Sequence, residues 1–283
     1  MANVTFGVGS GEVVVIVGPN GAGKTTTMEM LVGLRRPTSG ESRILDVPVE
    51  PSGPHRILVG VQLQQAGLPR RIRVSEAIAA ASSLYRAPVA AEQLLADVGL
   101  TEKRRDFIEK LSGGQRRRLD VALACAGDPP FLVLDEPTSG LDAEGRAELW
   151  DMLRQFSGRG KAILASTHDL AEAEAYADRL LMMRRGRLIR DGSVAEILAA
   201  AGGEWRLRMR GASTAVFALL TSAGLHRITV GDVTIVIGEQ GKLEHFRSEL
   251  LKSAHGEYTD ILSGPVRLED LFLSDEEQAE NDE

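Results

Sequence analysis

The chain has 283 residues, of which 43% are hydrophobic and 26% are charged, enough for one large core or for a large domain with a small one. Most of its net charge of −7 comes from residues 274–283, which hold six acids and no base; without those six the charge is −1. The nearly neutral charge of the remaining residues gives no support to nucleic-acid binding through a basic surface. We expect the acidic tail to be disordered.

Cysteine content and apolar runs indicate the compartment. The single cysteine, Cys125, excludes an intrachain disulfide and fits a reducing environment; we expect it to be a small buried side chain. No apolar run reaches the roughly 18 residues of a membrane span. The N-terminus lacks the basic region and long apolar run of a signal peptide. These features predict a cytoplasmic protein.

Short apolar runs alternate with helical patterns through the first two hundred residues or so. Buried strands are predicted at 12–17, 56–61, 131–135, 161–167 and 179–184, and helices near 75–84, 90–98, 115–126, 143–156 and 169–176. Strands that alternate with helices indicate a parallel sheet with crossover helices. Because residues 65–125 contain no strong strand pattern, we expect a helical subdomain there.

The pattern changes after residues 199–204. Residues 205–210 alternate in polarity, 214–224 are helical, 226–238 form a predicted hairpin, and 242–254 form an amphipathic helix. We therefore predict a main domain at 1–202, a small α+β domain at 203–273 and the tail at 274–283.

The segment "GPNGAGKT" (18–25) follows a predicted strand and opens a predicted helix. It matches G-x-x-x-x-G-K-[ST], in which glycines let backbone N–H groups turn toward phosphate at a positively polarised helix start. Lys24 is expected to reach the β- and γ-phosphates, Thr25 to bind Mg²⁺ and Thr26 to help hold the phosphates. The predicted nucleotide-binding residues here are Gly18, Pro19, Asn20, Gly21, Ala22, Gly23, Lys24, Thr25 and Thr26. The loop alone does not choose among kinases, GTPases and ATPases.

Two acids follow the apolar strand in "FLVLDEPTSGLD" (131–142). Asp135 is placed to hold Mg²⁺, directly or through water, as such strand-end aspartates do. Glu136 is expected to orient or deprotonate the attacking water. Another strand ends at "STHD" (166–169), where His168 can donate to a γ-phosphate, since strand ends of a parallel sheet face one crevice. A lone histidine is more often solvated or capping, so both roles stay open for His168.

A second glycine motif, "LSGGQ" (111–115), precedes a helical run. Two adjacent glycines cost about 1 kcal/mol each inside a helix, so they belong at its start. We expect the arginines at 116–118 to form a solvated helix face rather than a ligand contact.

Taken together, these motifs resemble the nucleotide-binding subunit of ATP-binding cassette (ABC) transporters. The phosphate loop, the glutamines of "VGVQLQ", "LSGGQ", "LVLDEP", "SGLD" and "STHD" follow in the family's order over about residues 4–200. The resemblance implies an α/β P-loop NTPase fold, with a RecA-like parallel-sheet core plus a helical subdomain, here joined to the small α+β C-terminal domain. It implies ATP and Mg²⁺ as ligands and ATP hydrolysis as the activity.

The resemblance also implies roles for single residues. Glu136 corresponds to the catalytic base, His168 to the histidine that senses the γ-phosphate, and Asp142 to the last residue of the loop called the D-loop. Of Gln62, Gln64 and Gln65, the family spacing selects Gln64 as a Mg²⁺ and catalytic residue. It lies four residues after a glycine and twelve before a glutamate.

Family cassettes pack head to tail and enclose two nucleotides. The resemblance therefore implies that Ser112, Gly113, Gly114 and Gln115 form an anion site for the γ-phosphate held by a partner, either a second copy or a paired cassette. The glycines allow close backbone approach.

The N-terminal part departs from the family pattern. Cassettes carry a strand and an adenine-stacking aromatic residue well upstream of the phosphate loop, but only 17 residues precede Gly18 here. "VTFGVGSGE" (4–12) resembles the family's second strand and turn, with Phe6 as a core residue. We thus expect the first strand and the aromatic to be missing, and ATP to bind more weakly by on the order of 1 kcal/mol.

The ending "VRLEDLFLS" (266–274) resembles cassettes of type-2 exporters in the daunorubicin-resistance-like group. This implies a subunit peripheral to the inner face of the cell membrane, with residues 65–110 contacting a separate permease that exports a drug, lipid or polysaccharide. The C-terminal domain either steadies the cassette dimer or is a generic appendage.

Three alternatives remain. A DNA- or ribosome-directed ABC ATPase would need long coiled coils or a second cassette. A phosphotransferase would not need "LSGGQ". The third is a regulatory cassette that hydrolyses ATP weakly.

Overall fold

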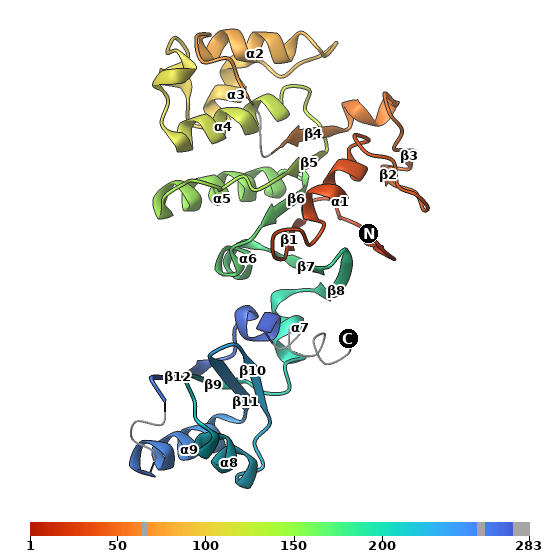
Figure 1. The fold of residues 1–283 in the computed structure, drawn as a ribbon. Helices are drawn as coiled ribbons and strands as arrows, with labels where there is room; N and C mark the ends of the chain where they lie inside the picture. The colour runs from red at the N-terminus through yellow and green to blue at the C-terminus, as the bar shows by residue number, and fades with distance from the viewer. Residues whose placement is uncertain (64–66, 254–257, 274–283) are drawn as a thin grey trace. The chain divides into compact units, whose positions relative to one another are not determined.

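A computed structural model of the chain describes residues 1–63, 67–253 and 258–273 (Figure 1). Contacts divide the chain into two compact units, Met1–Asp191 and Gly192–Glu283. The boundary between the units therefore lies earlier in the chain than the one near residue 202 that the sequence predicts. As a result, helix α7 (Val194–Ala199) belongs to the second unit. Gln64 and the acidic tail lie outside the described residues. Within the described ranges, no helix combines the length and apolar character needed to cross a bilayer.

A six-stranded sheet forms the centre of the first unit. Its order is β4 (Val59–Gln62), β5 (Phe131–Leu134), β6 (Ala162–Thr167), β1 (Val13–Val17), β7 (Arg179–Arg184) and β8 (Arg187–Gly192). The pairs β4–β5, β5–β6, β6–β1 and β1–β7 are parallel. The predicted α/β fold with a parallel-sheet core is confirmed. Strand β8 was missed because it holds only two apolar residues, Leu188 and Ile189, and so forms neither a long apolar run nor a strict alternation.

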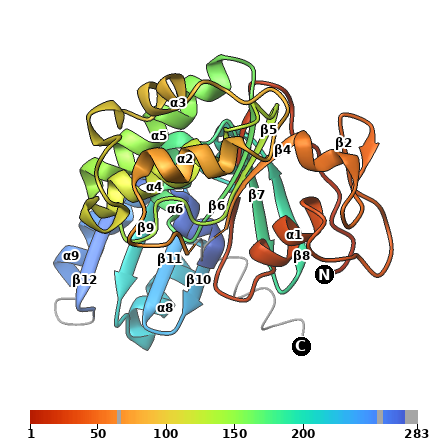
Figure 2. The ribbon, with the colours of Figure 1, turned by 90° about the horizontal axis from the view of Figure 1, so that it is seen from above.

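Helices cover both faces of this sheet, which explains why β1 is continuously apolar and fully buried. On one face, Val14 and Ile16 pack in a cluster with Met28 of α1 (Lys24–Leu31). Helices α5 (Ala143–Gly158) and α6 (Leu170–Tyr176) lie on the opposite face (Figure 2). Between them, the rings of Trp150 and Tyr176 stack with centroids 5.3 Å apart.

Three helices and two short 3₁₀ turns occupy the region where the sequence shows no strand. They are α2 (Val74–Ser82), α3 (Ala91–Asp97), η2 (Thr101–Lys103), η3 (Ile108–Lys110) and α4 (Gly113–Ala124). Figure 1 shows α2, α3 and α4 grouped beside β4. Fully buried side chains on these helices, Ile78, Leu94, Leu95 and Leu119, supply their apolar surfaces.

Two predicted strands differ from the structure. The segment predicted as a strand at 56–61 begins instead inside a 3₁₀ turn, η1 (Pro54–Ile57), because a proline with its fixed φ favours the first position of a helical turn. Residues 4–12 form no strand. Phe6 is nevertheless half-buried against the core cluster of the sheet. A short unpredicted hairpin joins β2 (Arg43–Ile44) to β3 (Val47–Pro48).

The second unit is built on an antiparallel sheet. Its order is β10 (Arg227–Val230), β11 (Val233–Gly238), β9 (Trp205–Arg210) and β12 (Asp260–Pro265). Leu207 and Val236 of this sheet pack against α8 (Thr214–Ser222) and α9 (Gln240–Ser253).

A buried ion pair lies near the end of the described chain. Residues 268–273 are helical and include Asp270, whose carboxylate is fully buried. Arg206 Nη1 donates to both Asp270 oxygens, at 2.7 and 2.6 Å. This ion pair therefore connects the helical residues 268–273 to β9.

Candidate nucleotide site

Three strands of the first unit deliver the predicted site residues to one edge of the sheet. The glycine-rich loop follows β1, Asp135 and Glu136 follow β5, and His168 follows β6. Strands β5, β6 and β1 are parallel neighbours, so their carboxyl ends meet at the same edge. The fold thus brings together residues more than a hundred positions apart in the chain.

The loop between β1 and α1 has the backbone of an anion cradle. Gly21 and Gly23 have φ values of 82° and 106°, in the left-handed region that favours glycine. The N–H groups at the start of α1 are positively polarised. They open onto a hollow of about 370 Å³ lined by Asn20, Gly21, Ala22, Gly23, Lys24, Thr25, Thr26 and Glu136.

The Lys24 ammonium lies across this loop. Its Nζ donates to the carbonyl oxygens of Gly18 at 2.7 Å and Pro19 at 3.3 Å. Burial lowers the pKa of Lys24, and the nearby carboxylates of Glu136 and Asp135 partly oppose that shift. A buried cation at the mouth of the cradle is suited to an anionic ligand.

Oxygen atoms suited to a metal ion lie at the cradle, since Thr25 lines its hollow. Thr25 Oγ1 donates to Asp135 Oδ2 at 2.9 Å, and Asp135 is only 1% exposed. A hydroxyl and a carboxylate are ligands that Mg²⁺ accepts. The residues therefore fit this ion by the chemistry of their donor atoms.

Ser166 on β6 is a site residue that the sequence analysis missed. Its Oγ accepts a hydrogen bond from the Glu136 backbone N–H at 2.9 Å and donates to Asp135 Oδ1. Ser166 is fully buried. A serine next to the last residue of a strand beside the acid-bearing strand is a signal that could have identified it.

Glu136 has an unusual backbone conformation. Its φ of 47° is left-handed, which costs about 1–3 kcal/mol for a residue other than glycine. Its Oε1 lies 3.4 Å from Nδ1 of His168. The imidazole is 61% exposed, so it lies at the surface of the site rather than inside it.

The signature segment caps α4. Ser112 Oγ accepts from the Gln115 N–H at 3.2 Å, and Gln115 Oε1 accepts from the Ser112 N–H at 3.1 Å. This reciprocal pair is a capping box. It explains the serine and glutamine that flank the two glycines.

The signature segment does not join the hollow of the phosphate loop. Gly113 lines a separate hollow of about 250 Å³, together with Arg116, Arg117, Asp120, Ser139, Gly140 and Leu141. The two hollows share no lining residue. Asp142 is exposed, and its Oδ1 caps α5 by accepting from the Gly145 N–H at 2.9 Å.

The arginines after the signature segment correct one expectation. They are half-buried rather than solvated. Arg116 Nη2 donates to the Leu68 carbonyl at 3.1 Å, and Arg118 Nη1 lies 3.3 Å from Glu148 Oε2. They contact other elements because α4 packs against its neighbours on several sides.

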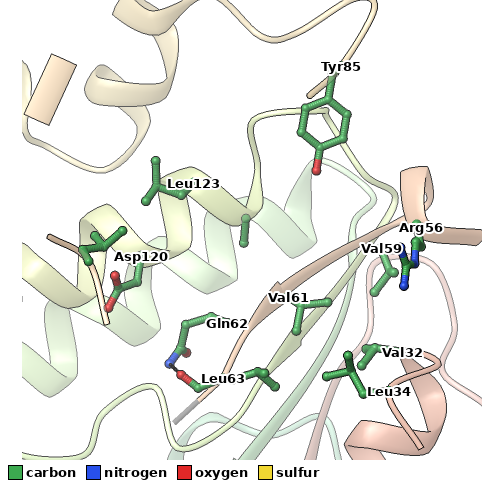
Figure 3. A pocket seen from close by; sticks show the side chains of 12 residues that line it. Val32, Leu34, Arg56, Val59, Val61, Gln62, Leu63, Tyr85, Asp120 and Leu123 are labelled. Carbon is green, nitrogen blue, oxygen red and sulfur yellow. Dashed lines mark hydrogen bonds between the residues drawn. The ribbon is translucent and has the colours of Figure 1, made fainter. Parts of the chain in front are cut away.

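A larger hollow of about 500 Å³ lies between β4 and α4 (Figure 3). Leu34, Leu68, Tyr85 and Leu123 contribute apolar surface to it. Gln62, the last residue of β4, and Asp120 of α4 face it (Figure 3). Both are nearly fully buried. Among the described residues, Gln62 Oε1 and Asp120 Oδ1 have no hydrogen-bond partner.

The cradle after β1 and the acid pair after β5 define a P-loop nucleoside triphosphatase. A family model described as "ABC transporter" matches residues 1–139. The chain is 34% identical over 283 residues to the "Nod factor export ATP-binding protein I" of Neorhizobium galegae, covering 96% of this chain and 79% of that protein.

Two further comparisons agree. The "Daunorubicin resistance ATP-binding protein DrrA3" of Streptomyces coeruleorubidus is 37% identical over 228 residues, covering 77% and 72% of the two chains. The dimeric structure of an ATP-binding cassette in a post-hydrolysis state, bound to ADP and Pi, matches with a TM-score of 0.60 and 26% identity, covering 68% and 89%. The chain belongs to the ABC transporter family. It is the subunit that binds and hydrolyses ATP.

Proposed function

We propose that this chain pairs head to tail with a second copy around two ATP molecules. The observation that carries the proposal is the separation of its two half-sites. The phosphate loop and the signature segment line different hollows of one chain. The start of α4, with two glycines and a serine, is suited to bind a phosphate group. The phosphate loop of the same chain, however, lies at a different hollow. A second copy supplies the missing half.

Each nucleotide is then held by two sets of residues. Residues 18–26 of one copy bind the phosphates, with Lys24 moving from loop carbonyls to phosphate oxygens. Ser112, Gly113, Gly114 and Gln115 of the other copy face the γ-phosphate, and Asp142 lies in the loop beside them. Thr25, Asp135 and Gln64 would hold Mg²⁺, which would supply positive charge to neutralise the phosphates.

The geometry at the end of β5 supports the hydrolytic roles that we propose. Glu136 accepts a proton from the attacking water and orients it. His168, with Nδ1 close to the Glu136 carboxylate, presents its ring to the γ-phosphate. Ser166 supports both acids from β6.

ATP turnover tests the assignment directly. The wild-type chain should hydrolyse ATP with a specific activity that rises steeply with protein concentration. Glu136→Gln should bind ATP, stay dimeric and hydrolyse almost none. Equal turnover by wild type and Glu136→Gln would remove Glu136 from the role of base.

Mixing two impaired variants tests the head-to-tail arrangement. Lys24→Ala disables the phosphate loop, and Ser112→Ala weakens the signature segment. In a mixed dimer one site receives both defects, whereas the other has an intact loop and an intact signature segment. Turnover regained on mixing supports the shared site; a mixture no more active than its components contradicts it.

We further propose that a separate membrane permease docks in the hollow between β4 and α4. The hollow is lined largely by apolar side chains, and Leu34 on its rim is 59% exposed. Exposed apolar surface of this kind marks interaction sites. Leu68 and Tyr85 belong to the segment 65–110 assigned to this contact from the sequence. The chain is then a cytoplasmic subunit, peripheral on the inner face of the cell membrane, without a nucleic-acid partner.

The names of the relatives support an exporter of a drug, lipid or polysaccharide, since they are called Nod factor export and daunorubicin resistance proteins. Leu34→Asp should abolish sedimentation of the chain with membrane vesicles from its own cells and leave turnover in solution unchanged. Unchanged sedimentation would place the permease contact elsewhere.

A further inference from the structure

A buried carboxylate outside the predicted site connects two of its loops. Glu172, in the first turn of α6, is 7% exposed. Its Oε2 accepts hydrogen bonds from Thr138 Oγ1 at 2.8 Å and from Thr167 Oγ1 at 3.0 Å. Both threonines are also buried. One carboxylate oxygen therefore joins the end of β6 to the turn after β5.

Each threonine lies within two positions of a residue of the proposed hydrolytic site. Thr138 follows Glu136 by two positions, and the Ser139 N–H donates to the Glu136 carbonyl at 3.1 Å within the same turn. Thr167 directly precedes His168, and its Oγ1 accepts from the Asp169 N–H at 3.0 Å. The bonds to Glu172 therefore restrain the backbone that carries Glu136 and His168.

The negative charge of this link has a partner on another helix. Arg146 Nη1 of α5 lies 3.6 Å from Glu172 Oε1 and 3.0 Å from Asp169 Oδ2. A buried carboxylate is stable when it is both paired and hydrogen-bonded. Glu172 does not line the hollow of the phosphate loop, so it acts through its neighbours.

We propose that Glu172 is a positioning residue for ATP hydrolysis, which fixes the turn bearing Glu136 relative to the strand end bearing His168. The same turn continues through Ser139, Gly140 and Leu141 to the hollow beside the signature segment. Glu172 thus links the histidine of one site to the loop that a second copy contacts. The inference rests on the proposed function because hydrolysis is the step that it positions.

Thr138→Val tests the link with little change of shape. It removes one hydroxyl from the carboxylate and keeps the β-branched side chain. We expect kcat to fall by about 10- to 100-fold, as displacement of reacting groups does, while KM and the Kd for ATP stay within about twofold. Thr138→Ser restores the hydroxyl and should restore most of kcat.

Glu172→Gln provides a second variant and a coupling test. It keeps the shape but presents a neutral side chain to both threonines and to Arg146. The double variant with Thr138→Val should lose much less than the product of the two single losses, because both changes break one link. Thr234→Val is the matched control: Thr234 is equally buried but lies in the second unit, and turnover should not change.

Three outcomes overturn the proposal. The first is an unchanged kcat in Thr138→Val and Glu172→Gln while wild type is active and Glu136→Gln is inert; it contradicts this inference and leaves the proposed function standing. The second is a loss confined to KM, or a loss equal to that of Thr234→Val. The third is a wild type without turnover, which removes the proposed function and this inference with it. Folded fractions measured by circular dichroism normalise every rate.

Discussion

The backbone N–H of Glu136 donates to the hydroxyl of Ser166 across 2.9 Å, between the ends of two neighbouring strands. The same hydroxyl donates to Asp135. One fully buried serine therefore orients both the residue proposed as base and the residue proposed to hold Mg²⁺. Its position on β6 means that these two acids depend on a strand other than their own.

Ser166→Ala should therefore impair both functions. We expect kcat to fall by about tenfold and the Mg²⁺ concentration for half-maximal turnover to rise, because an unpaired buried N–H costs about 1–3 kcal/mol and Asp135 loses a donor. Turnover measured across a Mg²⁺ titration checks this. Ser157→Ala removes a buried serine hydroxyl that donates to the Gly11 carbonyl instead, and should leave the titration unchanged. Identical titrations for Ser166→Ala and wild type would contradict the prediction.

Gly114→Ala separates contacts within the chain from contacts with a second copy. Within the described part of the chain, a Cβ at Gly114 meets no atom within 4 Å other than its neighbours and the backbone of its own helix. Alanine should stabilise α4 by up to about 1 kcal/mol relative to glycine, yet we expect turnover to fall strongly because the Cβ blocks close approach of the second copy's phosphate. Gly158→Ala, at the end of α5 and equally uncrowded, is the control that should keep full turnover. A fully active Gly114→Ala would argue against the shared site.

Asp120→Asn should change stability with a defined pH dependence. Burial raises the pKa of Asp120 to about 6, although Arg117 and Arg116 oppose the shift. The folded pKa then lies above the unfolded value of about 3.9, so wild type loses stability as the pH rises between these values. The asparagine variant avoids that loss. The free energy of unfolding of the variant should exceed that of wild type by almost nothing below pH 4. Above pH 6 the difference should reach on the order of 1 kcal/mol, after allowance for solvent screening.

Urea unfolding at a series of pH values measures this difference. Asp151→Asn, on the exposed face of α5, is the control substitution. An advantage of Asp120→Asn that shrinks as the pH rises would have the wrong sign.

Asp270→Asn should destabilise the second unit selectively. It leaves the Arg206 guanidinium, 12% exposed, without its charged partner, and breaking a buried pair in this way costs about 3–5 kcal/mol. We expect earlier unfolding and faster proteolysis of residues 204–273, with the Kd for ATP unchanged. Glu269→Gln breaks the neighbouring exposed pair with Arg208 and should cost less than about 1 kcal/mol. Equal effects of the two substitutions would contradict the assignment.

Much of this site was predictable because its motifs lie beside strong strand patterns. The run 12–17 is continuously apolar, so the position of residues 18–25 at a strand end followed from the sequence. The parallel arrangement then placed Asp135 and His168 at the same edge. Ser166 and Glu172 escaped prediction because their roles depend on hydrogen bonds across 30 or more residues. A position near a strand end can mark such a residue as a candidate, but the local sequence does not show which distant group it bonds.

The secondary-structure errors have a similar origin. Strands β8 and β12 are amphipathic or polar edge segments, and pairing with a neighbour rather than apolar periodicity defines them. The strand predicted at 56–61 starts late because Pro54 begins a 3₁₀ turn ahead of it. In both cases tertiary context outweighs local preference.

The left-handed backbone of Glu136 carries a final consequence. Relief of that strain by glycine is worth about 1–3 kcal/mol, more than the roughly 0.4–1 kcal/mol that glycine costs through the entropy of the unfolded chain. Selection for heat resistance alone would therefore favour glycine at position 136. Glu136→Gln, in contrast, keeps the shape of the side chain and the backbone strain. The chain therefore keeps a strained backbone at Glu136, a position where we propose that a carboxylate is chemically required.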